Sequence, residues 1–270
     1  LYQELPPSRK QNEGMNGGGR KLLAFSDSRQ EAAFFAPYLD RTYNRAVQRR
    51  LIYQALNGFE GRSPLSEDLS RRVRLLAEET RFLDPERDNS AEARTWVMQE
   101  ILAMDRRQSL EGTGMARISL LLPPDLALPP AVAKLGFDLS EYQLLLEVLF
   151  SITRGQGAVE PLQDVDLKDE AFSPRNRSFG VRERESDFQT VGWLPGKGNN
   201  RRLDFVKRVF LKRQIEADPT DFMRAIWIHE LTSNPSWDKR FKKIERNDGT
   251  VRMISPDWLE FSLGAPSQVP

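Results

Sequence analysis

The chain has 270 residues, of which 29% are charged and 39% hydrophobic, and its formal net charge is +1. This balance excludes a uniformly basic protein but allows local basic patches. The lack of cysteine and the single histidine exclude disulfides, thiolate metal sites and imidazole-rich metal centres. No apolar run approaches the roughly 20 residues that span a bilayer, and the first ten residues lack a signal-peptide pattern. We therefore expect a cytoplasmic protein without a membrane partner.

The first predicted element is a strand that leads directly into a helix. Residues 1–19 combine proline, glycine and polar side chains and are predicted to be a linker or disordered. The apolar run 22–25 is typical of a strand that is buried on both faces of a parallel sheet. Ser28 and the glutamate three residues later have capping-box spacing, which predicts the start of a helix. We expect that helix to kink at Pro37 and to end at Asn57.

The middle of the chain is predicted to be mostly helical. Apolar residues recur at helical spacing after Ser66, Ser90 and Ser140, and we expect each serine to cap its helix. Residues 117–122 have the pattern of a strand. Residues 160–200 are rich in charges, glycine and proline, which favours short strands and loops.

The last part of the chain regains regular patterns. A helix is predicted over 201–214, and Asp218 followed by proline predicts the start of a second helix. Residues 247–249, Asn-Asp-Gly, lie between alternating segments and indicate a hairpin, and a final strand is expected at 258–261. The order of two helices, a hairpin and a strand is typical of a winged-helix module. The fold class is therefore α+β and mainly helical.

The helix predicted over 201–214 is strongly basic. Leu203, Val206 and Phe210 form one apolar stripe, and cations occupy the remaining positions. We predict that these cations contact nucleic-acid phosphates: Arg201, Arg202, Lys207, Arg208, Lys212 and Arg213. An ordinary solvated helix face is the alternative interpretation of the same charges. A second basic segment leads into the hairpin and contains Lys239, Arg240, Lys242, Lys243 and Arg246.

The sequence contains no self-sufficient active site. The glycine-lysine pair in residues 194–200 lacks the spacing of a phosphate-binding loop. His229 precedes a glutamate but has no second histidine one turn later, which argues against a zinc protease. The acidic residues in 164–170 lack the pattern of a calcium loop and are interpreted as solvated.

Residues 21–43, KLLAFSDSRQEAAFFAPYLDRTY, resemble the motif IV region that opens the second RecA-like domain of large bacterial DEAD/DEAH-box superfamily 2 helicases. Residues 108–118, 172–176 and 192–208 are similar to segments of an insertion in that domain. The resemblance implies an ATP-driven motor that translocates on or unwinds DNA. Bacterial DNA repair or phage defence would be its setting.

The resemblance also implies contacts at the start of the motor domain. Ser26 and Ser28 match the motif IV loop, which approaches the nucleic-acid backbone, and Arg29 opens the helix that follows. We therefore expect these three residues to contribute to nucleic-acid binding. Ser26 and Ser28 as simple helix caps are the alternative.

Other helicase motifs are missing from the sequence. We find no phosphate loop, no DEAD or DEAH box and no arginine-finger motif. We therefore expect a fragment without a cofactor of its own. ATP and magnesium would bind in the parent enzyme, and the partners of the fragment would be DNA and the rest of the helicase polypeptide. The predicted parts of the fragment are 20–57, the start of a second RecA-like domain; 58–200, a helical insertion with an irregular segment; 201–264, the winged-helix-like module; and 265–270, a tail.

Two alternative functions are compatible with the sequence. A protein-interaction scaffold would have an exposed apolar patch on the helices of 66–104 and no salt-sensitive affinity for DNA. An autonomous enzyme would need a convergent set of acids and bases, which these residues do not suggest.

Overall fold

The computed structural model describes residues 29–102, 109–166, 172, 191–193, 200–241, 244–245, 250–251 and 253–264. Side chains are described from residue 42 onward, except in the short strands at 191–192, 244–245 and 250–251. The strand predicted at 22–25 and the linker predicted at 1–19 lie outside the described residues.

The chain divides into two compact units, Leu1–Val47 and Gln48–Pro270. The described part of the first unit is helical backbone, which belongs to helix α1 (Arg29–Asn57). The helix includes Pro37 and ends at Asn57, where the Asn-Gly pair predicted its end.

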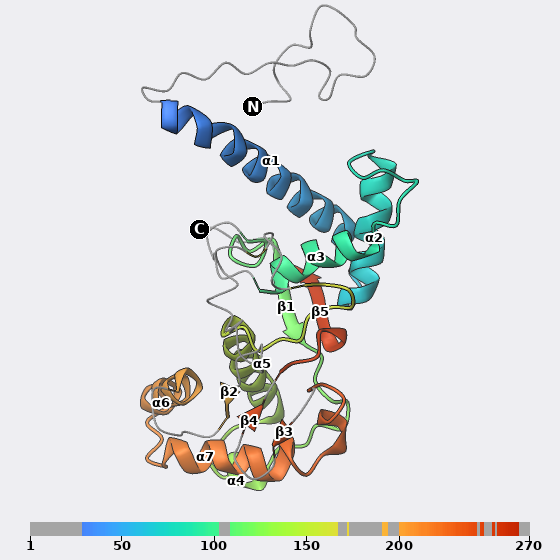
Figure 1. The fold of residues 1–270 in the computed structure, drawn as a ribbon. Helices are drawn as coiled ribbons and strands as arrows, with labels where there is room; N and C mark the ends of the chain where they lie inside the picture. Colours follow the sequence, from blue (N-terminus) through green and yellow to red (C-terminus); the bar gives the residue numbers. More distant parts are fainter. Residues whose placement is uncertain are drawn as a thin grey trace, which may run out of the picture. The chain divides into compact units, whose positions relative to one another are not determined.

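The second unit is α+β and mainly helical, which confirms the predicted fold class (Figure 1). Its helices after α1 are α2 (Ser66–Glu79), α3 (Ser90–Ile101), α4 (Pro130–Ala133), α5 (Leu139–Gly155), α6 (Arg201–Arg213) and α7 (Pro219–Ile226). A π-helical turn, η5 (Trp227–Leu231), continues α7, and two 3₁₀ turns follow, η6 (Pro235–Trp237) and η7 (Pro256–Trp258). Helices are therefore found at each of the predicted positions.

Two small antiparallel sheets join distant parts of the second unit. Strand β1 (Ala116–Leu120) pairs with β5 (Leu259–Leu263), so that Ala116 lies opposite Leu263 and Leu120 opposite Leu259. The other sheet has the order β2-β4-β3, with β2 at Val191–Gly192, β3 at Ile244–Glu245 and β4 at Thr250–Val251. The β3-β4 pair confirms the predicted hairpin. The final strand does not extend this hairpin sheet but pairs with β1, about 140 residues earlier in the chain.

The core follows helix α5, which packs against both β1 and α6. Phe150 of α5 contacts the rings of Trp193, Trp237 and Phe241, with centroid distances of 5.5, 5.2 and 5.5 Å. The indole N–H of Trp193 donates to the carbonyl of Met223 at 3.2 Å. Aromatic burial of this kind contributes a large share of the apolar area in a domain core.

The predicted serine caps are wrong, although the helices themselves are present. Ser66 and Ser90 are the first residues of α2 and α3, and neither helix has a side-chain cap at its N-cap position. The buried hydroxyl of Ser66 instead donates to the carbonyl of Pro256 at 2.7 Å. In α5 the cap is Asp138, which forms a capping box with Glu141.

Candidate nucleic-acid interface

Helix α6 is firmly anchored by its apolar stripe. The side chain of Asn200 accepts hydrogen bonds from the backbone N–H groups of Arg202 and Leu203 and so caps the helix. Leu203, Val206 and Phe210 are buried as the sequence predicted. Phe210 packs edge-on against Phe222 of α7, with a centroid distance of 5.1 Å. The opposite face of α6 is therefore held rigidly toward solvent.

Three cations form a line on that exposed face, which we call the α6 stripe: Arg201, Arg208 and Lys212. All three are exposed. Their spacing of seven and eleven residues places them within an arc of about 40° on a helix with 3.6 residues per turn, and the line is about 16 Å long. Asp204 lies one turn from Arg201 and is also exposed. The stripe thus carries an excess of positive charge with one acid beside it.

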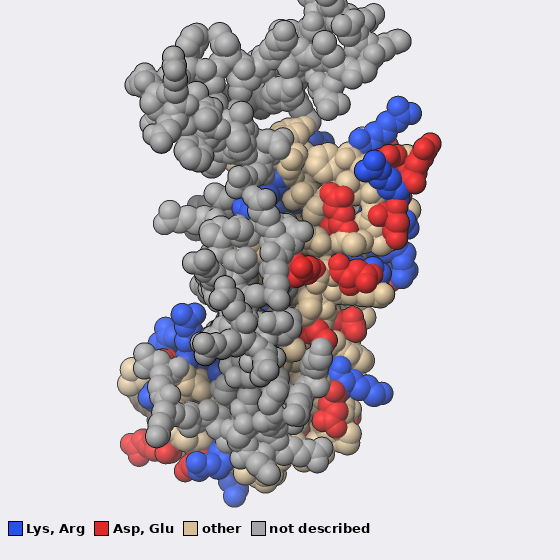
Figure 2. All heavy atoms as spheres, viewed as in Figure 1, with Lys and Arg blue, Asp and Glu red and all other residues tan. Residues whose placement is uncertain are grey.

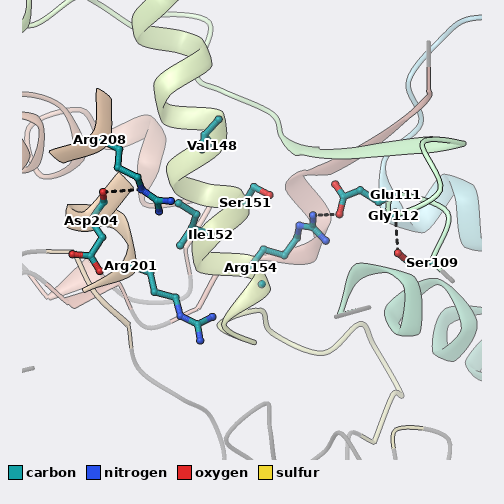
Figure 3. A pocket seen from close by; sticks show the side chains of 11 residues that line it. Ser109, Glu111, Gly112, Val148, Ser151, Ile152, Arg154, Arg201, Asp204 and Arg208 are labelled. Atoms are coloured by element: carbon teal, nitrogen blue, oxygen red, sulfur yellow. Dashed lines mark hydrogen bonds and ion pairs between the residues drawn. The ribbon is translucent and has the colours of Figure 1, made fainter. Parts of the chain in front are cut away.

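A groove of about 880 Å³ borders the α6 stripe. Figure 3 shows α5 in the middle of this groove, with side chains of α6 on one side and the segment containing Ser109 and Gly112 on the other. The floor is contributed by α5 and consists of Val148, Ser151, Ile152 and Gly155. The α6 wall consists of Arg201, Asp204 and Arg208.

The two walls differ in how their charges are compensated. Toward the far wall, Arg154 of α5 is buried, forms an ion pair with Glu111 of that wall and donates to the carbonyl of Ile101 at 2.7 Å. On the α6 wall, Arg208 donates from Nε to the backbone carbonyl of Asp204 at 3.2 Å, which leaves its charge without a carboxylate partner among the described residues. The accessible positive charge of the groove therefore lies along α6.

The prediction that Arg202 contacts a nucleic acid requires correction. Its side chain is 3% exposed and points into the protein, where Nη1 donates to Gln156 Oε1 at 2.6 Å and to Thr153 Oγ1 at 3.3 Å. Burial lowers the pKa of Arg202 to about 10, so the guanidinium remains charged at neutral pH. Arg202 fastens the start of α6 to the end of α5 and cannot reach a polyanion in solution.

The other predicted cations of α6 lie away from the stripe. Arg213 forms an ion pair with Glu141 of α5 and lies 4.4 Å from the ring centroid of Phe137. This cation–π contact and ion pair anchor the end of α6. Lys207 is exposed, but the geometry of the helix turns it about 100° or more away from the stripe.

The remaining predicted contacts divide into three groups. Ser26 and Ser28 lie outside the described residues, and Arg29 is the first residue of α1 with its side chain outside the described part. In the second basic segment, Lys239 is exposed whereas Arg240 is 3% exposed. The other three cations of that segment are not among the described residues. Sequence reasoning missed the buried roles of Arg154, Arg202 and Arg240.

The charge distribution on the visible face agrees with this assignment. Figure 2 shows Lys and Arg side chains at the position of α6 with Asp and Glu side chains near them, and both signs over the rest of the described surface on this face.

In the part of the chain that the structure describes, no helix is long and apolar enough to cross a bilayer. The same residues contain no group of three or more acids and histidines that could hold a metal ion.

A second, smaller cavity of about 150 Å³ lies between α2 and α3 and contains three arginines. Arg94 donates to both carboxylate oxygens of Glu67, at 3.0 and 2.7 Å. This hydrogen bond lowers the pKa of Glu67 and raises that of Arg94. Arg71 and Arg74 pair with acids of their own helix at 3.4 and 3.6 Å. The cavity is therefore internally neutralised and is not a candidate for binding a polyanion.

Glu230 is a buried acid without a cationic partner in the described structure. It lies in the π turn η5, 3% exposed, and accepts hydrogen bonds from Trp237 Nε1 at 2.7 Å and Asn234 Nδ2 at 3.1 Å. Burial raises the pKa of Glu230, and nearby Asp125 raises it further. A carboxyl whose pKa is raised by folding stabilises the fold below its ordinary pKa, and that stability is lost as the pH rises through the raised value.

We therefore expect Glu230→Gln to raise the free energy of unfolding at pH 7.5. The amide oxygen keeps the hydrogen bonds from Trp237 and Asn234, and the substitution removes the buried charge, which outweighs the changed contact with the backbone of Ala127. The difference in free energy of unfolding between this variant and the wild type should shrink toward pH 4. Urea unfolding at pH 7.5 and at pH 4 measures it. Glu230→Leu, which leaves the Trp237 and Asn234 donors unpaired, should be destabilising at both. Identical urea unfolding curves for the wild type and Glu230→Gln at pH 7.5 would contradict the claim that a buried charge on Glu230 lowers stability.

No family model matches the chain, and searches of curated proteins and of solved structures found no match to it.

Proposed function

We propose that this chain is the DNA-binding portion of an ATP-dependent superfamily 2 helicase or translocase, and that the α6 stripe holds the nucleic-acid backbone. One observation carries the proposal: Arg201, Arg208 and Lys212 lie in line on the exposed face of an anchored helix, and Arg201 and Arg208 line a groove beside it. Cations in such a line bind phosphates by releasing counterions and do not read the base sequence. The stripe would thus position a strand for a motor that acts elsewhere.

The assignment to a motor rests on the resemblance of residues 21–43 to the motif IV region. In this proposal, residues 20–57 begin a RecA-like domain, and ATP and magnesium bind in the parent enzyme. Residues 201–264 would be a winged-helix-like module. The succession of α6, α7 and the β3-β4 hairpin supports that interpretation, while the pairing of β5 with β1 ties the module to the helical insertion.

The scaffold alternative has less support in the described structure. It requires an apolar patch on the helices of 66–104, and there the described residues expose a single large apolar side chain, Leu75, by 38%. A singly exposed leucine is ordinary on a protein surface. We therefore favour the interpretation that relies on the charged face of α6.

Replacing Arg208 and Lys212 together by alanine should weaken DNA binding roughly tenfold, because two charge-assisted contacts are lost. The loss should be similar on two unrelated sequences, since phosphate contacts carry no sequence information. Fluorescence anisotropy with labelled 20-mers measures it.

Arg62→Ala combined with Lys134→Ala is the matched control, because it removes one exposed arginine and one exposed lysine that lie outside both basic segments. It should change the affinity by less than about threefold. Equal losses in the two double variants would show that general charge, and not the α6 stripe, governs binding.

A further inference from the structure

We propose that the groove beside α6 binds single-stranded nucleic acid, with the backbone on the α6 stripe and unpaired bases on the floor of the groove. This inference rests on the proposed function and adds the form of the substrate. The residues that carry it belong to α5 and α6, whereas the resemblance to helicases rests on residues 21–43.

The floor of the groove suits the faces of bases better than phosphates. Val148 and Ile152 offer apolar surface, and Ser151 and Gly155 leave space between them. A Cβ atom built on Gly155 would meet no atom within 4 Å, so this part of the floor is open. Flat, weakly polar base faces gain from such a surface, whereas a phosphate there would lose hydration without a partner.

The carboxylates of the groove favour the same arrangement. Asp204 lies on the α6 wall between Arg201 and Arg208, whereas Glu111 on the far wall is paired with Arg154. A carboxylate repels phosphate but accepts hydrogen bonds from the N–H donors of bases, such as the exocyclic amino groups of cytosine and adenine and the ring N–H of thymine. Phosphates are thus confined to the line of cations, and the base edges are directed toward Asp204.

An aromatic side chain lies beside the stripe as well. Phe205 is half-buried and lies one helical turn from both Arg201 and Arg208. Aromatic rings interleaved with cations are typical of surfaces that bind single strands, because every base can stack on them. A duplex keeps its bases stacked inside, so it would use the cations but neither the ring nor the floor.

The test compares a 15-nucleotide oligothymidine with a 15-base-pair duplex, both at 100 mM salt, using the full chain. Ser151→Leu fills the groove without adding charge, and Phe205→Leu removes the ring while keeping an apolar side chain. Each should raise the ratio of the single-strand Kd to the duplex Kd at least threefold. Ala91→Leu, which adds the same bulk to an exposed position of α3, should leave the ratio unchanged.

The outcomes separate this inference from the proposed function. If Ser151→Leu and Phe205→Leu leave the ratio as it is in the wild type, the single-strand inference is overturned, while loss of binding in the Arg208→Ala and Lys212→Ala variant still supports the stripe. If polyglutamate of equal charge displaces the oligothymidine as well as unlabelled oligothymidine does, the groove recognises only charge and the inference is likewise overturned. If the wild type binds neither nucleic acid, both proposals are wrong.

Discussion

Replacing Arg240 with methionine is expected to lower the free energy of unfolding by roughly 3 to 5 kcal/mol. The guanidinium of Arg240 donates to the carbonyls of Leu121 and Ser236, both at 2.6 Å, and to that of Leu122 at 3.3 Å. It also lies 4.2 Å from the ring centroid of Trp258. Methionine fills much of the space but leaves these partly buried carbonyls without their donor.

The contacts of Arg240 explain why so large an effect is expected from one side chain. The side chain joins Leu121 and Leu122, which follow β1, to Ser236 before the hairpin and to Trp258 after it. Burial lowers the pKa of Arg240, yet the carbonyls compensate its charge. Urea unfolding followed by tryptophan fluorescence measures the loss. Lys239→Met, at the exposed neighbouring position, should change stability by less than about 0.5 kcal/mol, and an equal loss there would refute this role.

Replacing Glu100 with leucine is the second substitution for which a large loss is expected, roughly 2 to 4 kcal/mol. Glu100 is 5% exposed, and its two oxygens have different partners. Oε1 accepts from Arg49 Nε at 2.6 Å, and Oε2 accepts from the backbone N–H of Leu110 at 2.9 Å. The substitution leaves a partly buried guanidinium and a buried amide unpaired.

A double-mutant cycle with Arg49→Met distinguishes the ion pair from the backbone contact. If the ion pair contributes, the double variant should lose less free energy of unfolding than the two single variants lose together, by about 1 kcal/mol or more. Glu79→Leu, at an exposed position of α2, is the matched control and should be nearly neutral. Strict additivity in the cycle would show that the Arg49 contact adds no stability.

The sequence predicted regular elements well because their causes are local. The stripe of Leu203, Val206 and Phe210 identified the buried face of α6, and Asp218 before a proline identified the start of α7. The Asn-Asp-Gly turn predicted the β3-β4 pair for the same reason. Each of these signals depends on spacing within one or two turns of chain.

The sequence could not predict which polar residues are buried by distant partners. Arg201 and Arg202 are adjacent and chemically identical, yet only Arg202 meets Gln156 and Thr153, nearly 50 residues earlier in the chain. Ser66 resembles a helix cap, but its hydroxyl bonds a carbonyl 190 residues away. The pairing of β5 with β1 is equally remote. Such contacts follow from the tertiary fold, and helical spacing alone offers just one hint: Arg202 borders the apolar stripe.

The most direct test of the account is the salt dependence of DNA affinity. For the wild type, the logarithm of the association constant should fall linearly with the logarithm of salt concentration. Replacing Arg201, Arg208 and Lys212 together by alanine should reduce that slope by about two to three, roughly 0.7 to 0.9 for each lost phosphate contact. An unchanged slope in the triple variant would show that these cations do not contact the backbone, and would contradict the proposed role of α6.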